Sequence, residues 1–235
     1  MNGVMAVYQK ELRHYFRSPI AYYVVAVFLI GTGYFYTYNV FLSSTATMDA
    51  TFQNMGILLT VVAPAISMRL FAGEWSGQTM ELLATLPLRP WEVVIGKYLG
   101  AVTMLLLMTV GTVIDLVPMY MFAEPETTTI ISGYVGFFLM GMACLALGQF
   151  FSVLTQNQIV AALITVAVLL GFWFVGNLQT FQSSVFLWNL VGYLSFSAHF
   201  ADFIQGLVTA ESVVFYLVIA GIALTLNAGY LQWRR

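Results

Sequence analysis

Between Glu126 and Asp202 the chain has no Asp, Glu, Lys or Arg, and the middle of this segment, residues 131–178, reads ISGYVGFFLMGMACLALGQFFSVLTQNQIVAALITVAVLLGFWFVGNL. A helix needs about 20 apolar residues to cross the hydrocarbon core of a bilayer. The segment is too long for one such helix, and the polar run Gln156-Asn157-Gln158 divides it. The pattern predicts membrane-spanning helices over residues 131–153 and 159–178.

The composition of the whole chain indicates that most of it is surrounded by lipid. Of the 235 residues, 60% are hydrophobic and 8% are charged, with a mean hydropathy of +0.88. A water-soluble surface needs roughly 25–35% charged residues. A membrane β-barrel would alternate polar and apolar residues in short segments, whereas these runs are apolar on every side. Because backbone groups in lipid must be satisfied internally, the sequence predicts an all-α membrane protein that forms one domain, residues 1–235.

Charged residues mark the ends of the other spans. No charge occurs between Arg17 and Asp49 or between Asp49 and Arg69, and the third apolar stretch contains only Asp115. Together with the two helices above, the predicted spans number six; the remaining four cover residues 20–41, 54–71, 93–122 and 212–233.

The basic residues fall on one side of this six-span arrangement, whereas the opposite loops contain acids and no base. Because Lys and Arg stay on the cytoplasmic side of a membrane, we expect both termini in the cytoplasm. The basic residues are Lys10, Arg13, Arg17, Arg69, Arg89, Lys97, Arg234 and Arg235.

The N-terminal segment, residues 4–17, has the pattern of an amphipathic helix that lies in the membrane interface. Its apolar residues Val4, Tyr8, Leu12 and Tyr15 recur at helical spacing. A basic face toward anionic headgroups is typical of such helices. The alternative is a basic flank that only sets orientation. The charged residues off the apolar line are Lys10, Glu11, Arg13 and Arg17, with His14 beside them.

The loop after the second span, residues 69–92, reads RLFAGEWSGQTMELLATLPLRPWE. Residues 79–83 can start a short helix that Pro87 would stop. A short, stiff, charged loop suits a segment that receives a push from a soluble partner. An ordinary polar loop is the alternative that the residues alone leave open.

This loop carries a resemblance to a known family. The motif consists of Phe71-Ala72-Gly73-Glu74, Thr79-Met80-Glu81-Leu82-Leu83, Leu86-Pro87, Trp91-Glu92 and Gly96-Lys97. It resembles the signature of type-2 ABC exporter permeases, most closely the gliding-motility permease family. One position departs from the pattern, because Gln78 stands where the family usually has Gly.

The resemblance implies a permease subunit in a bacterial inner membrane, paired with a second permease subunit and driven by two copies of a separate ATPase subunit. Residues 74–87 would be the coupling helix, residues 4–17 the interface helix with Lys10, Arg13 and Arg17, and residues 186–207 short re-entrant helices on the outer side. ATP would be bound by the partner, so this chain would need no cofactor. The residues expected to couple to the ATPase are Glu74, Thr79, Glu81, Leu82, Pro87 and Arg89.

Three other features of the sequence need an interpretation. Asp115 either lines a pathway or senses protons, or it reaches headgroups and caps a helix that Pro118 breaks. His199 and Asp202 share a helical face, where a structural hydrogen bond is favoured over a metal site. Small residues that let helices approach closely are a packing feature; they are Gly133, Gly136, Gly141 and Gly148.

The sequence has no phosphate-binding loop, because Gly96-Lys97 lacks the earlier glycine that this motif requires. It also has no hydrolase or zinc-protease motif, so we do not expect an enzyme. Few basic residues and their membrane-flanking positions argue against a nucleic-acid partner. The first hypothesis is an ABC exporter permease. The alternative is a membrane scaffold that transmits ATPase-driven work to a periplasmic or envelope partner without transport. A secondary transporter is disfavoured, since no internal repeat is visible.

Overall fold

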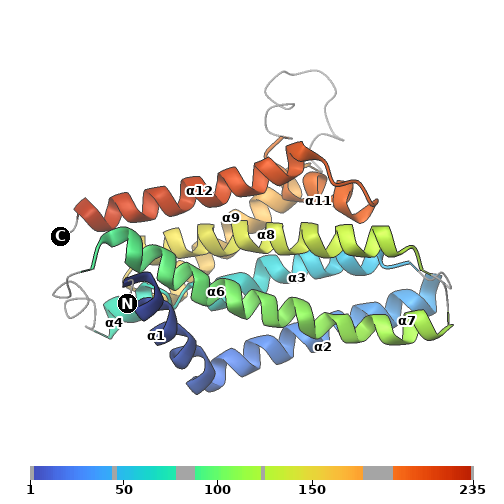
Figure 1. Ribbon diagram of the computed structural model, residues 1–235, viewed down its shortest axis with the longest axis horizontal. Helices are drawn as coiled ribbons and strands as arrows, with labels where there is room; N and C mark the ends of the chain where they lie inside the picture. Colours follow the sequence, from blue (N-terminus) through green and yellow to red (C-terminus); the bar gives the residue numbers. More distant parts are fainter. Residues whose placement is uncertain (1–2, 44–46, 78–87, 123–124, 177–192, 234–235) are drawn as a thin grey trace.

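The computed structural model describes residues 3–43, 47–77, 88–122, 125–176 and 193–233, and all the regular structure in these residues is helical. The long helices run up and down in one bundle, and both chain ends lie at the same end of it (Figure 1). We call this the terminal end of the bundle, and the other the opposite end. The helices are α1 Gly3–Arg17, α2 Pro19–Ser43, α3 Asp49–Ser67, α4 Ala72–Ser76, α6 Pro90–Thr112, α7 Leu116–Phe122, α8 Thr127–Leu154, α9 Gln158–Phe174, α11 Phe196–Ile204 and α12 Ala210–Trp233.

Among the described residues, five segments are long and apolar enough to cross a membrane. They are Pro19–Val40, Asp49–Ser76, Pro90–Met121, Thr127–Leu154 and Ala210–Trp233. The helix predicted over residues 159–178 is α9, but its 17 residues end at Phe174 and fall short of the length for a span. Six crossings are therefore still a prediction, while the all-helical, multi-span architecture is confirmed.

The second span differs most from its predicted bounds. The prediction covered residues 54–71, whereas α3 begins at Asp49 and ends at Ser67. An acidic residue in the first turn is favourable at the positive end of a helix, so Asp49 starts the helix instead of flanking it. At the other end the chain turns between Ser67 and Ala72 before α4 begins.

The third span is broken near its end at the position where Asp115 lies. A short 3₁₀ turn, Val113–Asp115, separates α6 from α7. Pro118 follows within the first turn of α7, and its ring excludes the α-helical backbone bond that would reach the carbonyl four residues earlier. The α-helix of the third span is therefore interrupted in the turn that precedes Pro118.

Helix α8 lies at the centre of the bundle, packed by α3, α6, α9, α11 and α12. Its glycines make these approaches possible, as predicted. A Cβ on Gly133 would collide with the Phe52 ring, and one on Gly141 would lie 2.7 Å from the Leu105 methyl groups. Gly136 and Gly148 meet side chains of α11 and α3 in the same way. The packing of these helices thus depends on missing side chains, as is common in membranes.

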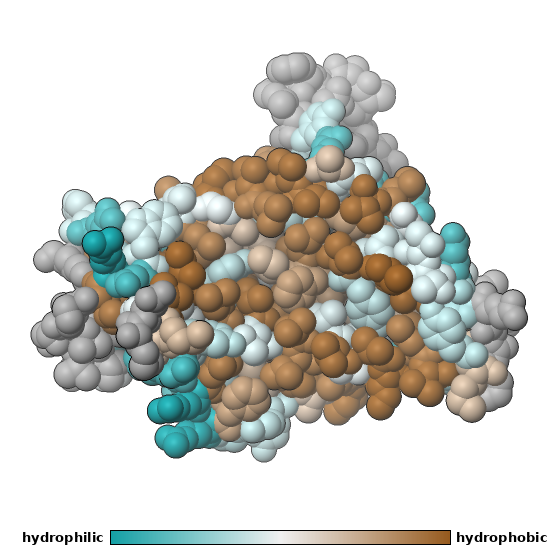
Figure 2. Space-filling view, in the orientation of Figure 1, coloured by the Kyte–Doolittle hydropathy of each residue, from teal (hydrophilic) through white to brown (hydrophobic). Residues whose placement is uncertain are grey.

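Apolar side chains also cover the outside of the bundle. Figure 2 shows a hydrophobic belt across its middle, with hydrophilic atoms toward the two ends. Large apolar residues such as Ile30, Val110 and Ile159 are more than half exposed. Such a surface is compatible with lipid as the surrounding solvent, which agrees with the multi-pass membrane protein that the composition predicts.

Of the segment predicted to form re-entrant helices, residues 186–192 lie outside the described residues. The rest contains α11, a nine-residue helix that buries Phe196, Phe200 and Phe203. The chain then reverses at Gly206, whose φ of 85° is a left-handed conformation that favours glycine. A re-entrant position of α11 in the membrane is still a prediction.

Candidate functional site

The N-terminal helix is present, but the face that it buries overlaps the predicted one only at Tyr15. Val7, Glu11 and Tyr15 are the buried residues of α1, whereas Tyr8 and Leu12 are only partly buried. The apolar spacing alone placed Glu11 on the polar face. In the structure α1 lies against α6 at the terminal end (Figure 1), so this face contacts protein instead of lipid.

A buried ion-pair network explains why Glu11 faces inward. Lys97, on α6, is 1% exposed, and its Nζ lies 2.7 Å from Glu11 Oε1 and 2.9 Å from Glu74 Oε1. The Nζ of Lys10, on the outer side of α1, lies 2.7 Å from the same Glu74 oxygen. Two carboxylates and two ammonium groups make the network neutral overall. A buried charge is tolerated when it is paired in this way.

The network connects three elements that are far apart in the sequence. Glu11 belongs to α1, Glu74 to α4 and Lys97 to α6. The Lys97 ammonium also lies 5.2 Å from the centre of the Phe71 ring, just before α4, at cation–π distance. A displacement of any one of these elements would separate buried charges, so the three elements should move as one body.

Two glycines on α6 allow α1 to approach this closely. A Cβ on Gly96 would lie 2.7 Å from the Val7 Cβ and 2.9 Å from the Val4 carbonyl oxygen. A Cβ on Gly100 would lie 2.8 Å from the Glu11 Cβ. Gly96 and Gly100 are four residues apart and therefore on one face of the helix, the spacing that permits close helix crossing.

Side chains near the C-terminal end of α8 hold the turn between α3 and α4. Ser152 Oγ accepts hydrogen bonds from the backbone N–H groups of Phe71 at 3.1 Å and Ala72 at 3.0 Å. The same hydroxyl donates to the Met68 carbonyl at 2.8 Å. Buried Gln149 donates to the Val94 carbonyl on α6 at 3.0 Å. The central helix is thereby joined to both ends of the 69–92 loop.

Of the loop residues predicted to couple to the ATPase, the structure describes Glu74 and Arg89. Glu74 is directed into the network, and Arg89 is exposed immediately before α6. The backbone N–H of Arg89 donates to Glu92 Oε2 at 2.8 Å, which caps α6. Thr79, Glu81, Leu82 and Pro87 lie outside the described residues.

The interface-helix residues have different surroundings. Arg13 and Arg17 are exposed, and Lys10 is half exposed while it pairs with Glu74. Burial raises the pKa of Tyr15 far above its usual range, so its hydroxyl stays protonated and donates to the Ile66 carbonyl at 3.2 Å. That bond attaches the end of α1 to the end of α3.

Sequence analysis missed the pairing of Lys97 with Glu11. The two residues are 86 positions apart, so no local spacing reports their contact. The available signal was Lys97 itself, because a lysine about 10 Å inside an apolar helix needs a buried acid.

The other candidates lie toward the opposite end of the bundle. Asp115 is half-buried, and its Oδ1 would lie 3.9 Å from a Cβ on Gly33 of α2. His199 and Asp202 both bond to Ser212 Oγ, the imidazole Nδ1 at 3.0 Å and the carboxylate Oδ2 at 2.9 Å. The His199 ring also stacks on Phe215, with ring centres 4.0 Å apart. These bonds attach α11 to the start of α12.

A family profile described as "ABC-2 family transporter protein" matches residues 5–231, which extend from α1 into α12. No curated protein matches the chain significantly.

Proposed function

Because the chain belongs to the ABC-2 family of transporter proteins, it is a membrane permease subunit, and we propose that it is the export pathway of a complex powered by separate ATPase chains. The family implies an ABC ATPase partner in general. We propose further that two permease subunits and two ATPase subunits assemble in a bacterial inner membrane. We also propose that the chain is closest to the gliding-motility permeases, whose signature the 71–97 motif resembles.

The observation that carries the proposal is the Lys97 network. Residues 78–87 connect α4 to α6, and both of these helices are held in one body by Glu74, Lys97 and Glu11. A push on residues 78–87 from an ATPase would therefore reach α6 directly. It would also reach α8 through Ser152 and Gln149. We infer that Glu74 anchors the coupling segment, while Thr79, Glu81, Leu82, Pro87 and Arg89 contact the partner.

The direction of the helices supports six crossings with both termini in the cytoplasm. Helix α8 ends at the terminal end, and so does α12 (Figure 1). The chain between them must therefore travel to the opposite end before α12 begins. Helix α9, with α11 after it, makes that passage in the bundle. We propose that the terminal end faces the cytoplasm, since α1 and the 69–92 loop carry most of the basic residues.

Cross-linking tests the proposed docking segment. Cys144 is the one cysteine in the sequence and is fully buried, so an introduced cysteine can be modified selectively. The Glu81→Cys variant is labelled with a maleimide that carries a photoreactive group and is mixed with the proposed ABC ATPase partner. Illumination should give a permease–ATPase adduct. The adduct should change in yield when ATP is replaced by a non-hydrolysable analogue.

The matched control is Thr128→Cys, an exposed position in the first turn of α8 at the opposite end. It should give no ATPase adduct under the same conditions. Equal adduct yields at residues 81 and 128, or an adduct at 128 alone, would refute docking at the terminal end.

A further inference from the structure

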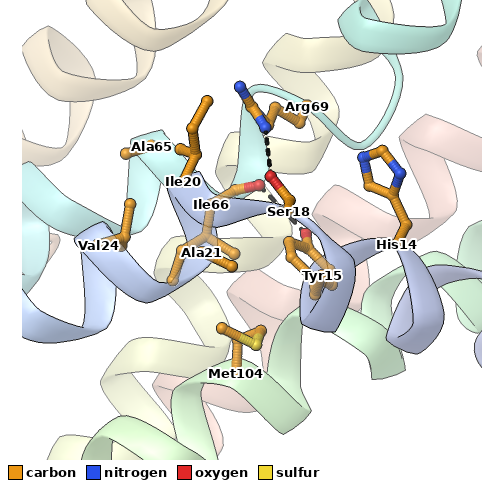
Figure 3. A pocket seen from close by; sticks show the side chains of 10 residues that line it. All are labelled: His14, Tyr15, Ser18, Ile20, Ala21, Val24, Ala65, Ile66, Arg69 and Met104. Carbon is orange, nitrogen blue, oxygen red and sulfur yellow. Dashed lines mark hydrogen bonds between the residues drawn. The ribbon is translucent and has the colours of Figure 1, made fainter.

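A pocket lies where α1, α2 and the end of α3 meet, and it has two chemically different sides (Figure 3). His14, Ser18 and Arg69 form the polar side, and Ile20, Val24 and Met104 form the apolar side. Tyr15 closes the pocket between them through its bond to the Ile66 carbonyl. A polar site continuous with an apolar one suits an amphipathic ligand.

The Arg69 guanidinium has hydrogen-bonding capacity left over. One of its terminal nitrogens donates to Ser18 Oγ at 3.1 Å. Its Nε is buried and has no hydrogen-bond partner among the described residues. An arginine has five N–H donors and prefers a bidentate anion such as a carboxylate or phosphate. In the described part of the chain, however, the ion pairs are made by Lys10 and Lys97, and none by Arg69.

The surroundings of the pocket are positively charged. Arg13 and Arg17 are exposed on α1, and Ser18, which follows Arg17, accepts a hydrogen bond from Arg69. The acids of the same region are engaged elsewhere, since Glu11 and Glu74 bind Lys97. Glu92 caps α6. The pocket therefore attracts an anion and offers it a partly buried guanidinium.

The apolar side continues along α2, where it can accommodate the hydrocarbon part of a ligand. Exposed residues follow one face of α2 from the pocket into the hydrophobic belt. They are Ile20 at 39%, Tyr23 at 70%, Val27 at 57%, Ile30 at 72% and Tyr34 at 63% exposure. We call this row the α2 lane. Figure 2 shows hydrophilic atoms over α1 directly beside the belt. The pocket thus lies at the level where lipid headgroups meet acyl chains.

We propose that this pocket binds one anionic phospholipid from the leaflet at the terminal end. The phosphate accepts hydrogen bonds from Arg69 and from the Ser18 hydroxyl, with His14 beside it. An acyl chain lies along the α2 lane. A basic pocket between spans at the membrane surface is a known way to hold an anionic headgroup. The lipid would join α1, α2 and α3, so its presence would set how firmly α1 is held. The proposal concerns the isolated chain and does not depend on the function proposed above.

Native mass spectrometry of the purified full chain tests the proposal. The detergent-solubilised protein is titrated with dioleoyl-phosphatidylglycerol, and separately with dioleoyl-phosphatidylcholine and with inorganic phosphate. We expect one phosphatidylglycerol to be retained at collision energies that remove phosphatidylcholine. Arg69→Gln should raise the apparent dissociation constant for phosphatidylglycerol about 10- to 100-fold, the range expected for loss of a hydrogen bond to a charged group.

Two further variants keep the result interpretable. His14→Glu changes an exposed residue, so the protein should fold. The added carboxylate should pair with Arg69 and repel the phosphate. This variant should therefore also weaken retention of phosphatidylglycerol at least tenfold. Arg89→Gln removes an exposed arginine at the same end but outside the pocket, and should leave retention unchanged. Equal retention of the two lipids, unchanged retention in His14→Glu, or full competition by inorganic phosphate would overturn the proposal.

Discussion

Replacement of Lys97 by Met should destabilise the protein by about 3–4 kcal/mol. Lys97 is 1% exposed and is the only described cation within 4 Å of Glu11, whose side chain is 7% exposed. Removing one partner of a buried ion pair typically costs about 3–5 kcal/mol, because the other charge stays buried without compensation.

The same network contains its own control. Lys10 is 54% exposed on its side chain, so Lys10→Ala breaks a largely solvated pair with Glu74 and should cost at most about 1 kcal/mol. The double variant Lys97→Met, Glu11→Met removes both charges of the Lys97–Glu11 pair and leaves Glu74 paired with Lys10. It should recover most of the stability lost in Lys97→Met.

The assay is the free energy of unfolding in mixed micelles, followed by tryptophan fluorescence at pH 7. Equal losses of stability in Lys97→Met and Lys10→Ala, or no recovery of stability in the double variant, would refute the buried ion pair.

Other substitutions test the remaining contacts. Gly96→Val should displace α1 from α6 and cost about 1–3 kcal/mol in unfolding free energy; Gly171→Ala, where an added Cβ meets nothing within 4 Å, should be neutral or slightly stabilising. Ser152→Ala removes the acceptor of two buried N–H groups and should cost about 1–3 kcal/mol, with faster proteolysis in the 69–92 loop. Unfolding free energies for Gly96→Val no lower than for Gly171→Ala, or unchanged proteolysis of Ser152→Ala, would contradict these contacts.

The long helices could be predicted because their signal is local. Each charge-free run is bounded by charged or polar residues such as Arg17, Asp49 and Glu126, and lipid leaves the backbone no alternative to helix. The close approaches at Gly133 and Gly141 were also predictable, since a missing side chain is visible in the sequence. The proline after Asp115 likewise indicated where the third span would break.

The candidate site was predicted only in part, because its geometry depends on contacts between distant residues. Glu74 was assigned to the coupling segment from the motif, but nothing near it indicated that Lys97 would draw it inward. Glu11 was assigned to the polar face because helical spacing describes one helix at a time. Its burial is decided by the opposite charge of Lys97 and by the space that Gly96 and Gly100 leave on another helix.

The length of α9 shows a different limit. Its apolar run continues to Gly176, whereas the α-helix ends at Phe174 and a 3₁₀ turn follows at residues 175–176. Residues 177–178, the end of the predicted span, lie outside the described residues. Hydropathy locates an apolar run, but it does not give the residue at which the α-helical backbone changes.

Accessibility of residue 81 from the two sides of the membrane tests the central claim most directly. Glu81→Cys is treated with a membrane-impermeant maleimide in intact cells and in inverted membrane vesicles, with buried Cys144 giving a low background. We predict labelling in inverted vesicles only, and slower labelling there when the ATPase is present. Labelling in intact cells would place the segment on the outer side and contradict an ATPase-driven permease moved through residues 78–87.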